Sequence, residues 1–331
     1  MGAAPERESN IEELSEDRLL TRFDELVESG LVVYNKNSRT VRLMDQCFAV
    51  RTSQASRNAV LNHVSHILQF EFRILSSLTT KPPAHSAAPP NCRPGSDINV
   101  TGYEMAALGP PDHEATHLLA ANKFPAARPH FLILTQDGWR RQHEALDAED
   151  FAAARQALDS LTRRPSLSSS CRRRRYLLFF NCGFDSGCSR VHKHMQVVPV
   201  DGDTETDFPM WPDAEDPRTP FKFSMERFRS GLPPVDELVK VYHRLLEEAE
   251  RAVGWERGRE GRHQDEALPH NLVLDERWMV VVPRRAPGWD GADTNAMGML
   301  GMVWVHDEER MQRWVDKGPA EVLRRLGYPA E

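Results

Sequence analysis

Residues 181–200, with the sequence NCGFDSGCSRVHKHMQVVPV, constrain this chain more than any other stretch. Side chains on a β-strand alternate between its two faces, so His192, His194 and Gln196 are expected to project together. The side chains between them turn to the opposite face. The pattern therefore predicts a strand that presents three polar groups on one wall.

A loop of small residues precedes this strand and contains Gly183, Ser186, Gly187 and Ser189. Its backbone N–H groups can approach an anion closely because these residues carry little or no side chain. A neutral imidazole is a good nucleophile towards phosphorus. The other histidine and the glutamine of the motif can orient that imidazole and donate to phosphate oxygens. The stretch predicts a phosphate-binding loop that faces a histidine nucleophile.

The 331 residues are 40% hydrophobic, which allows a sizeable core. A net charge of -7 argues against bulk attraction to nucleic acid or to an anionic membrane, so we expect neither partner. The acidic N-terminus lacks the apolar segment of a signal peptide, and no run approaches the roughly 20 apolar residues of a spanning helix. We expect a soluble, cytoplasmic protein, although composition does not separate cytosol from nucleus. The five cysteines form no CxxC pair, which favours reduced thiols.

Alternation and helical periodicity predict strand pairs with few helices between them, which favours an α+β fold with a mainly antiparallel sheet and helices packed on it. The predicted strands cover residues 31–34, 40–43, 117–121, 130–135, 176–180, 271–274, 278–282 and 299–305. Helices are predicted before Gly30, after Asp147, after Pro234 and over residues 309–326.

An Asp/Pro-rich link at residues 201–220 is the best internal boundary. It predicts an N-terminal half, residues 1–215, that carries the HxHxQ motif and the phosphate loop. The C-terminal half, residues 216–331, is then expected to complete the sheet and the nucleotide pocket. The polar segment 51–69 has no clear period and is interpreted as an insertion.

The pattern FFNCGxxSGxSxxHKHMQ resembles the histidine-triad and galactose-1-phosphate uridylyltransferase-like superfamily, in the branch that replaces the third histidine by glutamine. More closely, it is similar to the fungal diadenosine tetraphosphate phosphorylases, also called ATP adenylyltransferases. Further blocks carry the resemblance in the family's order and lie at residues 71–82, 117–135, 270–284 and 295–305. The resemblance therefore spans most of the chain and implies a histidine-triad-like fold.

The resemblance implies reversible phosphorolysis of diadenosine tetraphosphate to ATP and ADP through a covalent adenylyl-histidine. His194 would attack an α-phosphate that Gln196 contacts, and inorganic phosphate would then remove the adenylyl group. The implied partners are the small molecules of this reaction, and the oligomeric state stays open. A divalent cation, magnesium, is expected to travel with the polyphosphate, and no metal site of the protein's own is expected.

In the family's pattern, Asn181, Gly187 and Ser189 line the polyphosphate and Lys81 neutralises it. This chain departs from the pattern at Arg190, where the family usually has glutamine, and in the turn PAARPHF. Two other functions stay open. One is a related nucleotidyltransferase with sulfate or a sugar phosphate as acceptor, and the other is a catalytically impaired nucleotide-binding paralogue.

Simpler interpretations apply to several of these residues. The two motif histidines could bind zinc with Cys182 and Cys188, but their spacing matches no structural zinc pattern. Aromatic residues in the C-terminal half are predicted to belong to the core rather than to stack on adenine. No role is assigned to the remaining histidines of the conserved-looking blocks, which are His117, His130 and His270.

Overall fold

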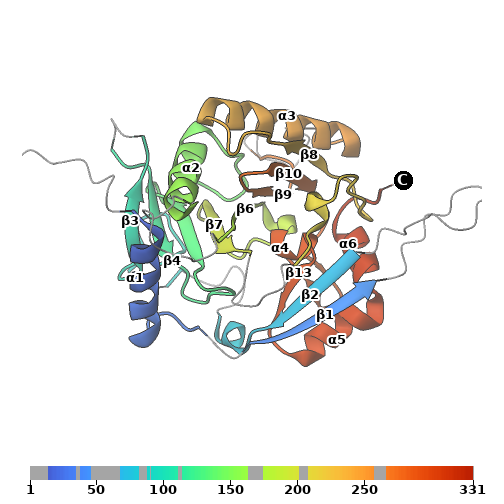
Figure 1. Ribbon diagram of the computed structural model, residues 1–331, viewed down its shortest axis with the longest axis horizontal. Coiled ribbons are helices and arrows are strands. Elements are labelled where there is room, and N and C mark those ends of the chain that lie inside the picture. Colours follow the sequence, from blue (N-terminus) through green and yellow to red (C-terminus); the bar gives the residue numbers. More distant parts are fainter. Residues whose placement is uncertain are drawn as a thin grey trace, which may run out of the picture.

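The structure is a computed structural model, and it describes residues 14–34, 38–45, 68–81, 88–89, 91–110, 114–162, 174–200, 208–256 and 266–330. Within these residues, eight strands form one large sheet in which every neighbouring pair is antiparallel (Figure 1). Their order is β3 (Glu104–Leu108), β4 (His117–Ala121), β5 (Phe131–Thr135), β7 (His194–Pro199), β6 (Tyr176–Cys182), β9 (His270–Leu274), β10 (Trp278–Pro283) and β8 (Ser224–Arg227). The strand that carries the motif, β7, is thus a central one.

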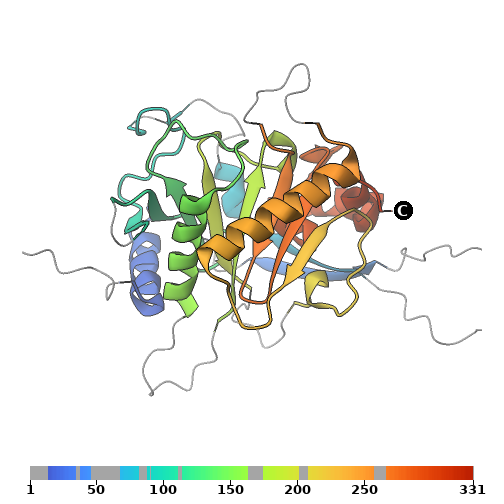
Figure 2. The same cartoon turned by 90° about the horizontal axis from the view of Figure 1, so that it is seen from above.

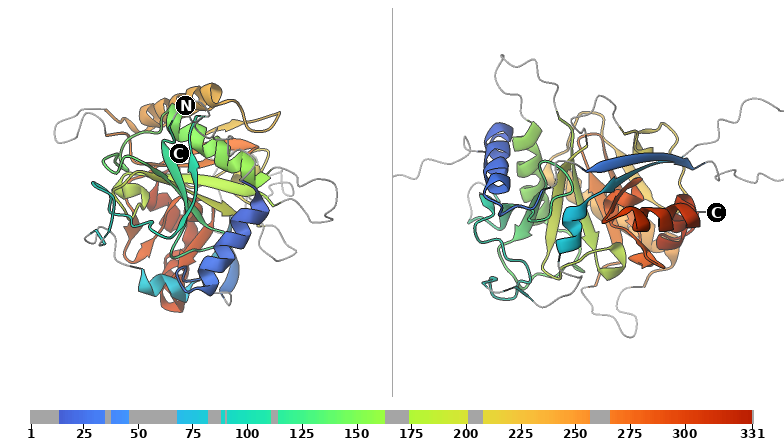
Figure 3. Two further views of the ribbon diagram at one scale, coloured as in Figure 1. Left: turned by 90° about the vertical axis from the view of Figure 1, so that its left-hand side faces the viewer. Right: turned by 90° about the horizontal axis from the view of Figure 1, so that it is seen from below.

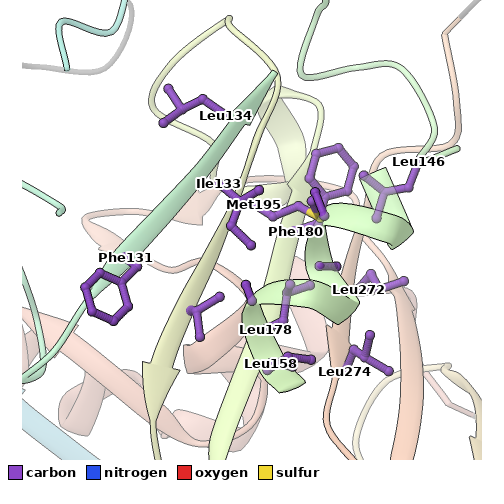
Figure 4. Close-up of a cluster of buried hydrophobic side chains, with 14 of the residues drawn as sticks. Phe131, Ile133, Leu134, Leu146, Leu158, Leu178, Phe180, Met195, Leu272 and Leu274 are labelled. Atoms are coloured by element: carbon purple, nitrogen blue, oxygen red, sulfur yellow. The ribbon is translucent and has the colours of Figure 1, made fainter. Parts of the chain in front are cut away.

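Three helices cover one face of this sheet: α1 (Glu16–Glu28), α2 (Ala148–Thr162) and α3 (Val235–Val253). Figure 2 shows α3 lying across the strands of the C-terminal half. Leu178 and Phe180 of β6 point to this side and join one apolar cluster with Phe151 of α2 and Leu245 of α3. Figure 4 shows part of that cluster, in which side chains from β5, β6, β7 and β9 meet the helix α2. The helices therefore pack against the central strands on one face of the sheet.

A second layer covers the opposite face (Figure 3). It contains a smaller sheet of β1 (Arg39–Asp45), β2 (Leu68–Ile74) and β13 (Met302–Val305), in which β13 runs parallel to β2. The helices α4 (Ala296–Met299), α5 (Glu308–Lys317) and α6 (Pro319–Leu326) lie on this side. Because both faces are covered, β6 is buried along its whole length, which explains the apolar run YLLFF that precedes Asn181.

Short elements complete the fold. The ribbon of β11 (Gly288–Trp289) and β12 (Ala292–Asp293) leads into α4. Single turns of 3₁₀-helix are η2 (Ser76–Thr80), η3 (Phe184–Ser186) and η4 (Trp211–Asp213). None of the helices in the described residues is both long and apolar enough to cross a membrane.

The predicted α+β architecture with a mainly antiparallel sheet is confirmed. Three local predictions were wrong. Residues 31–34 form no strand, because the N–H of Val32 turns back to the carbonyl of Leu26 at the end of α1, and β1 pairs with β2 instead. The last helix is divided in two at Gly318, whose φ of 77° ends α5 before Pro319 begins α6. Met299 belongs to α4 and not to the strand that follows.

Most of the proposed insertion, residues 51–67, lies outside the described residues.

Leu178 gives a test of this layered core. Its side chain is fully buried in the cluster that joins the sheet to α2 and α3. Truncation in Leu178→Ala should lower the free energy of unfolding by about 2–5 kcal/mol, because it removes buried methyl groups and leaves a cavity. Urea unfolding measures this loss. Leu31, which is 43% exposed, is the control, and Leu31→Ala should stay within about 0.5 kcal/mol of the wild type. Equal effects at both positions would contradict the assigned core.

Candidate active site

The motif strand divides its side chains between the two layers. Gln196 lies on the side of β13, since it bonds to His130, whose ring packs against Trp304. Lys193 lies on the opposite side, where its ammonium donates to Asp150 of α2 at 2.7 Å. His194 is at the first position of β7 and shares the face of Gln196, because strand residues two apart point the same way. The predicted alternation along the motif is therefore present.

The imidazole of His194 is held in one tautomer. Its Nδ1 lies 2.8 Å from the carbonyl oxygen of His192. A carbonyl can only accept, so Nδ1 carries the proton and the lone pair is on Nε2. Burial lowers the pKa of His194 to about 4, although the hydrogen bond to the His192 carbonyl works in the opposite direction. At neutral pH the ring is uncharged, which is the form that can attack phosphorus.

The ring of His192 is used entirely within the protein. Its Nδ1 is 2.8 Å from the hydroxyl of Ser96 and its Nε2 is 2.9 Å from that of Thr135. The Thr135 hydroxyl donates to the carbonyl of Asp137, so it accepts from the imidazole N–H. Both ring nitrogens are thus occupied. His192 orients the nucleophile through its carbonyl, and both nitrogens of its ring are bonded to hydroxyl groups of the protein.

Two side chains from distant parts of the chain fix the backbone of the motif. The Gln142 carboxamide accepts from the N–H of His194 at 2.8 Å and donates to its carbonyl at 3.0 Å. The Asp97 carboxylate accepts from the N–H groups of Val191 and His192 at 2.9 and 3.0 Å. Sequence reasoning missed both residues, because neither stands in a recognisable pattern.

The side of the motif that faces α2 is anchored by buried charges. Lys193 is 1% exposed, and its ammonium donates to Asp150 and to the carbonyl of Ala145, each at 2.7 Å. Asp150 also bonds to His117 at 2.9 Å. These partners hold the pKa of Asp150 below its usual range in spite of its burial. His117 therefore belongs to the support of the motif and lies on the face away from the nucleophile.

The small-residue loop is a tight turn in which the N–H groups of Gly183, Ser186 and Gly187 bond to backbone carbonyls. Gly183 and Gly187 have φ angles of 79° and 84°, which other residues rarely adopt. A Cβ on Gly187 would lie 2.3 Å from the carbonyl oxygen of Thr294. The hydroxyl of Ser186 donates to the carbonyl of Gly183 at 2.6 Å and is buried, so it stabilises the turn and does not face a ligand. Ser189 is partly exposed at the end of the loop.

Asn181 sits at the end of β6 with its amide orientation fixed. Its Oδ1 accepts from Asn271 Nδ2 at 2.8 Å and from the N–H of Ala296 at 3.0 Å. The N–H bonds of its Nδ2 are therefore the donors that it can offer to a phosphate. The buried guanidinium of Arg284 donates to Asn271 at 2.6 Å and to the carbonyl of Ser186 at 3.2 Å. Burial lowers the pKa of Arg284 to about 9. The C-terminal half thus braces the phosphate loop.

Lys81 is close enough to His194 to act on it electrostatically. It follows η2 directly, and its positive charge acts on both His194 and His130 and disfavours their protonation. The side chain is exposed, yet the protein around it removes part of its hydration. This loss of hydration lowers the pKa of Lys81, and the charge of Arg190 lowers it further. The structure therefore brings together a cation and the nucleophile, which are 113 positions apart in the sequence.

Among the described residues, no group of three or more histidine, cysteine or carboxylate side chains is placed to hold a metal ion. Cys182 and Cys188 flank the loop, and burial raises the pKa of both thiols, that of Cys188 to about 12.

A neutral histidine, carboxamide donors and a nearby lysine on an α+β fold are typical of an enzyme that transfers phosphate-containing groups. Comparison with protein-family models identifies the family within this class. Residues 36–214 match the Ap4A phosphorylase N-terminal domain, and residues 217–329 match the ATP adenylyltransferase C-terminal domain. The first match alone covers more than half of the chain, which therefore belongs to the Ap4A phosphorylase family, as its sequence motifs indicated. The large sheet and the β2–β13 pairing join residues from both matched regions.

Individual relatives agree with this assignment. The chain is 28% identical to diadenosine 5',5'''-P1,P4-tetraphosphate phosphorylase 2 of Saccharomyces cerevisiae over 292 residues, which are 79% of this chain and 84% of the relative. It is 26% identical to Protein APA1 of the same yeast over 67% of this chain and 72% of the relative. The crystal structure of yeast Ap4A phosphorylase Apa2 in complex with Ap4A superposes with a TM-score of 0.66 and 20% identity, over 97% of this chain and 98% of that one. The histidine-triad-like fold is confirmed.

The lowered histidine pKa values predict a pH-dependent stability. Unfolded His194 takes up a proton near pH 6.5 and the folded residue only near pH 4. In this window the unfolded chain binds more protons, so the free energy of unfolding should fall by about 1–2 kcal/mol between about pH 6.5 and pH 5 on account of this ring. Urea unfolding at several pH values measures the slope.

His194→Asn is the reference for that measurement, since it lacks the titrating group. Subtracting its slope also removes the contribution of Asp275, whose pKa burial raises to about 6 and whose effect on stability has the opposite sign. The wild-type curve should be steeper than the variant curve. Parallel curves would mean that His194 titrates normally in the folded protein.

Gly187→Ala tests the close approach at the phosphate loop. Alanine should suffer the backbone strain of a positive φ, about 1–2 kcal/mol, and in addition should displace the loop from Thr294, with loss of activity. Gly231 is a matched control, because its φ of 81° is similar but no atom lies within 4 Å of a Cβ built there. Gly231→Ala should cost stability alone. Equal activity in the two variants would show that the loop geometry is not needed.

Proposed function

We propose that this protein phosphorolyses diadenosine tetraphosphate to ATP and ADP, reversibly, through an adenylyl group carried on His194. The observation that carries the proposal is the fixed, neutral imidazole whose Nδ1 is bonded to the His192 carbonyl, which leaves the Nε2 lone pair for attack on phosphorus. The family assignment and the yeast relative named as a diadenosine tetraphosphate phosphorylase support the substrate.

In the first step, Nε2 of His194 attacks an α-phosphorus of the dinucleotide. A P–N bond forms, the P–O bond to the bridging oxygen breaks, and ATP leaves. Negative charge grows on the non-bridging oxygens, and fixed donors there stabilise the transition state. The donors that the structure offers are the carboxamides of Asn181 and Gln196, whereas the N–H groups of Gly183 and Gly187 already bond to the carbonyls of Gln142 and Phe184. The charge of Lys81 favours the polyphosphate.

In the second step, an oxygen of inorganic phosphate attacks the same phosphorus, the P–N bond breaks, and ADP leaves. His194 returns to its neutral form without an external base, because the proton stays on Nδ1, hydrogen-bonded to the His192 carbonyl, throughout. The carbonyl also stabilises the positive charge that the ring acquires while it is bonded to phosphorus. This arrangement suits a ping-pong reaction.

The remaining functional expectations stay proposals. Phosphate is the acceptor we expect in place of sulfate or a sugar phosphate, and the cytoplasm is the expected location. Magnesium would be held by oxygens of the polyphosphate, because the protein wall there carries lysine and amide donors and not a carboxylate cluster. Bound in that way, the ion would neutralise charge on the leaving nucleotide.

Intact-mass spectrometry tests the covalent step. The protein is mixed with diadenosine tetraphosphate in the absence of phosphate, and the wild type should gain the mass of one adenylyl group. His194→Ala should gain none. His243→Ala is the control, since His243 is an exposed histidine of α3 and should leave the labelling unchanged. A wild-type enzyme that turns over without ever gaining the mass, or an active His194→Ala variant, would contradict the proposal.

A further inference from the structure

His130 is a buried histidine with no role in the steps above. It immediately precedes β5, and the strand residue two positions later, Leu132, pairs with Gln196. Its side chain is 2% exposed. The ring packs against Trp304 of β13 and Phe179 of β6, with centroid distances of 5.7 and 6.3 Å. One strand of the large sheet and one strand of the small sheet therefore hold this imidazole in place.

The hydrogen bonds of His130 determine which of its nitrogens carries the proton. The backbone N–H of Ala126 donates to Nδ1 at 3.1 Å, so Nδ1 must have the lone pair. The proton of a neutral ring is then on Nε2, which lies 2.9 Å from the side-chain oxygen of Gln196. The Nδ2 of Asn122 lies 3.2 Å from Nε2, but it is itself a donor and cannot accept that proton, since the Asn122 oxygen accepts from the N–H of Phe124. His130 thus donates to Gln196.

This bond has a consequence for the glutamine. A carboxamide can turn by 180° and exchange its oxygen for its NH₂ group, which would present oxygen lone pairs to a phosphate. In Gln196 that turn would place NH₂ hydrogens against the N–H of His130, two donors facing each other. The turned state therefore loses a buried hydrogen bond and gains a repulsive contact. The histidine keeps the NH₂ group on the side of the substrate.

We propose that His130 is a positioning residue that fixes the Gln196 carboxamide so that its N–H donors face the transferred phosphoryl group. The inference rests on the proposed function, in which Gln196 contacts that phosphoryl group. The aromatic contacts with Trp304 and Phe179 and the N–H of Ala126 are what make the imidazole rigid enough for this task. His130 itself does not touch the substrate.

A double-mutant cycle tests this role. His130→Phe keeps an aromatic ring against Trp304 but removes the N–H, and Gln196→Ala removes the group that is positioned. Each single variant should lower kcat/KM for diadenosine tetraphosphate, Gln196→Ala by on the order of 10²-fold, as for other donors that stabilise a developing oxyanion. In the Gln196→Ala background, adding His130→Phe should change kcat/KM by less than about twofold, because residues in one hydrogen-bond network are not additive.

A structural role would give a different result. If His130 served only to pack the core, His130→Phe would multiply the loss in both backgrounds, and that outcome overturns the proposal. His130→Gln is the rescue variant, since its amide can donate to Gln196, and it should recover activity relative to His130→Phe. A His130→Gln variant as impaired as His130→Phe while equally folded would also contradict the role of the donor.

Two further measurements keep the test interpretable. Thermal unfolding and circular dichroism establish that each variant is folded, and if His130→Phe is not, His130→Gln and His130→Asn take its place in the cycle. AMP affinity measured by calorimetry needs no turnover, and it should weaken in His130→Phe but be insensitive to that change when residue 196 is alanine. A wild type without adenylyl transfer would refute the proposed function itself, whereas an active wild type with additive variants would refute only the positioning role.

Discussion

The hydrogen bond from Nδ1 of His194 to the carbonyl of His192 is the contact on which the rest of the site depends. An imidazole has two chemically similar nitrogens, and only a fixed acceptor on one of them makes the other a directed nucleophile. Here the acceptor is a backbone atom two residues away, so its position is set by the conformation of the chain itself. Ser96, Thr135, Asp97 and Gln142 can all be understood as the means of holding that short stretch of backbone still.

The arrangement depends on burial as much as on hydrogen bonds. Burial lowers the pKa of His130, His192 and His194, so a cluster of histidines next to a lysine carries no positive charge of its own at neutral pH. The anion would meet Lys81 and oriented amide dipoles, while the nucleophile keeps its lone pair. On the far side, the pairing of Lys193 with Asp150 allows a charged residue to lie between the two histidines without exposing the core to water. One face of the motif therefore presents neutral histidines, and the other face carries a buried ion pair.

Much of the framework could be predicted from sequence because it is local. The period-two alternation of HKHMQ, the glycine positions of the loop and the cap of α2 by Asp147 all depend on neighbours within a few residues. The hairpins β4–β5 and β9–β10 follow from apolar runs around short turns, and the family motifs gave the overall topology. Failures occurred where a local pattern had two solutions. Leu31 to Tyr34 reads as a strand, but the end of α1 provides the acceptor that turns it.

The supporting residues could not be found in that way, because their roles arise only when distant segments meet. Gln142 lies 52 residues from His194, and Asp97 lies 95 residues from His192. One weak signal for supporting residues was present in the sequence. His130 and Thr135 are the polar residues at either end of the apolar run FLIL, and polar residues at the ends of a buried strand are candidates for a functional site. For Ser186, composition predicted a ligand donor, whereas the buried hydroxyl closes its own turn.

The stereochemical course at phosphorus tests most directly whether an imidazole carries the adenylyl group between two acceptors. A dinucleotide with a chiral phosphorothioate at the attacked phosphorus is converted to labelled ADP, and the configuration of the product is determined by ³¹P NMR. Two successive in-line displacements, one by His194 and one by phosphate, predict net retention. Net inversion would mean that phosphate attacks the dinucleotide directly, and it would contradict the account.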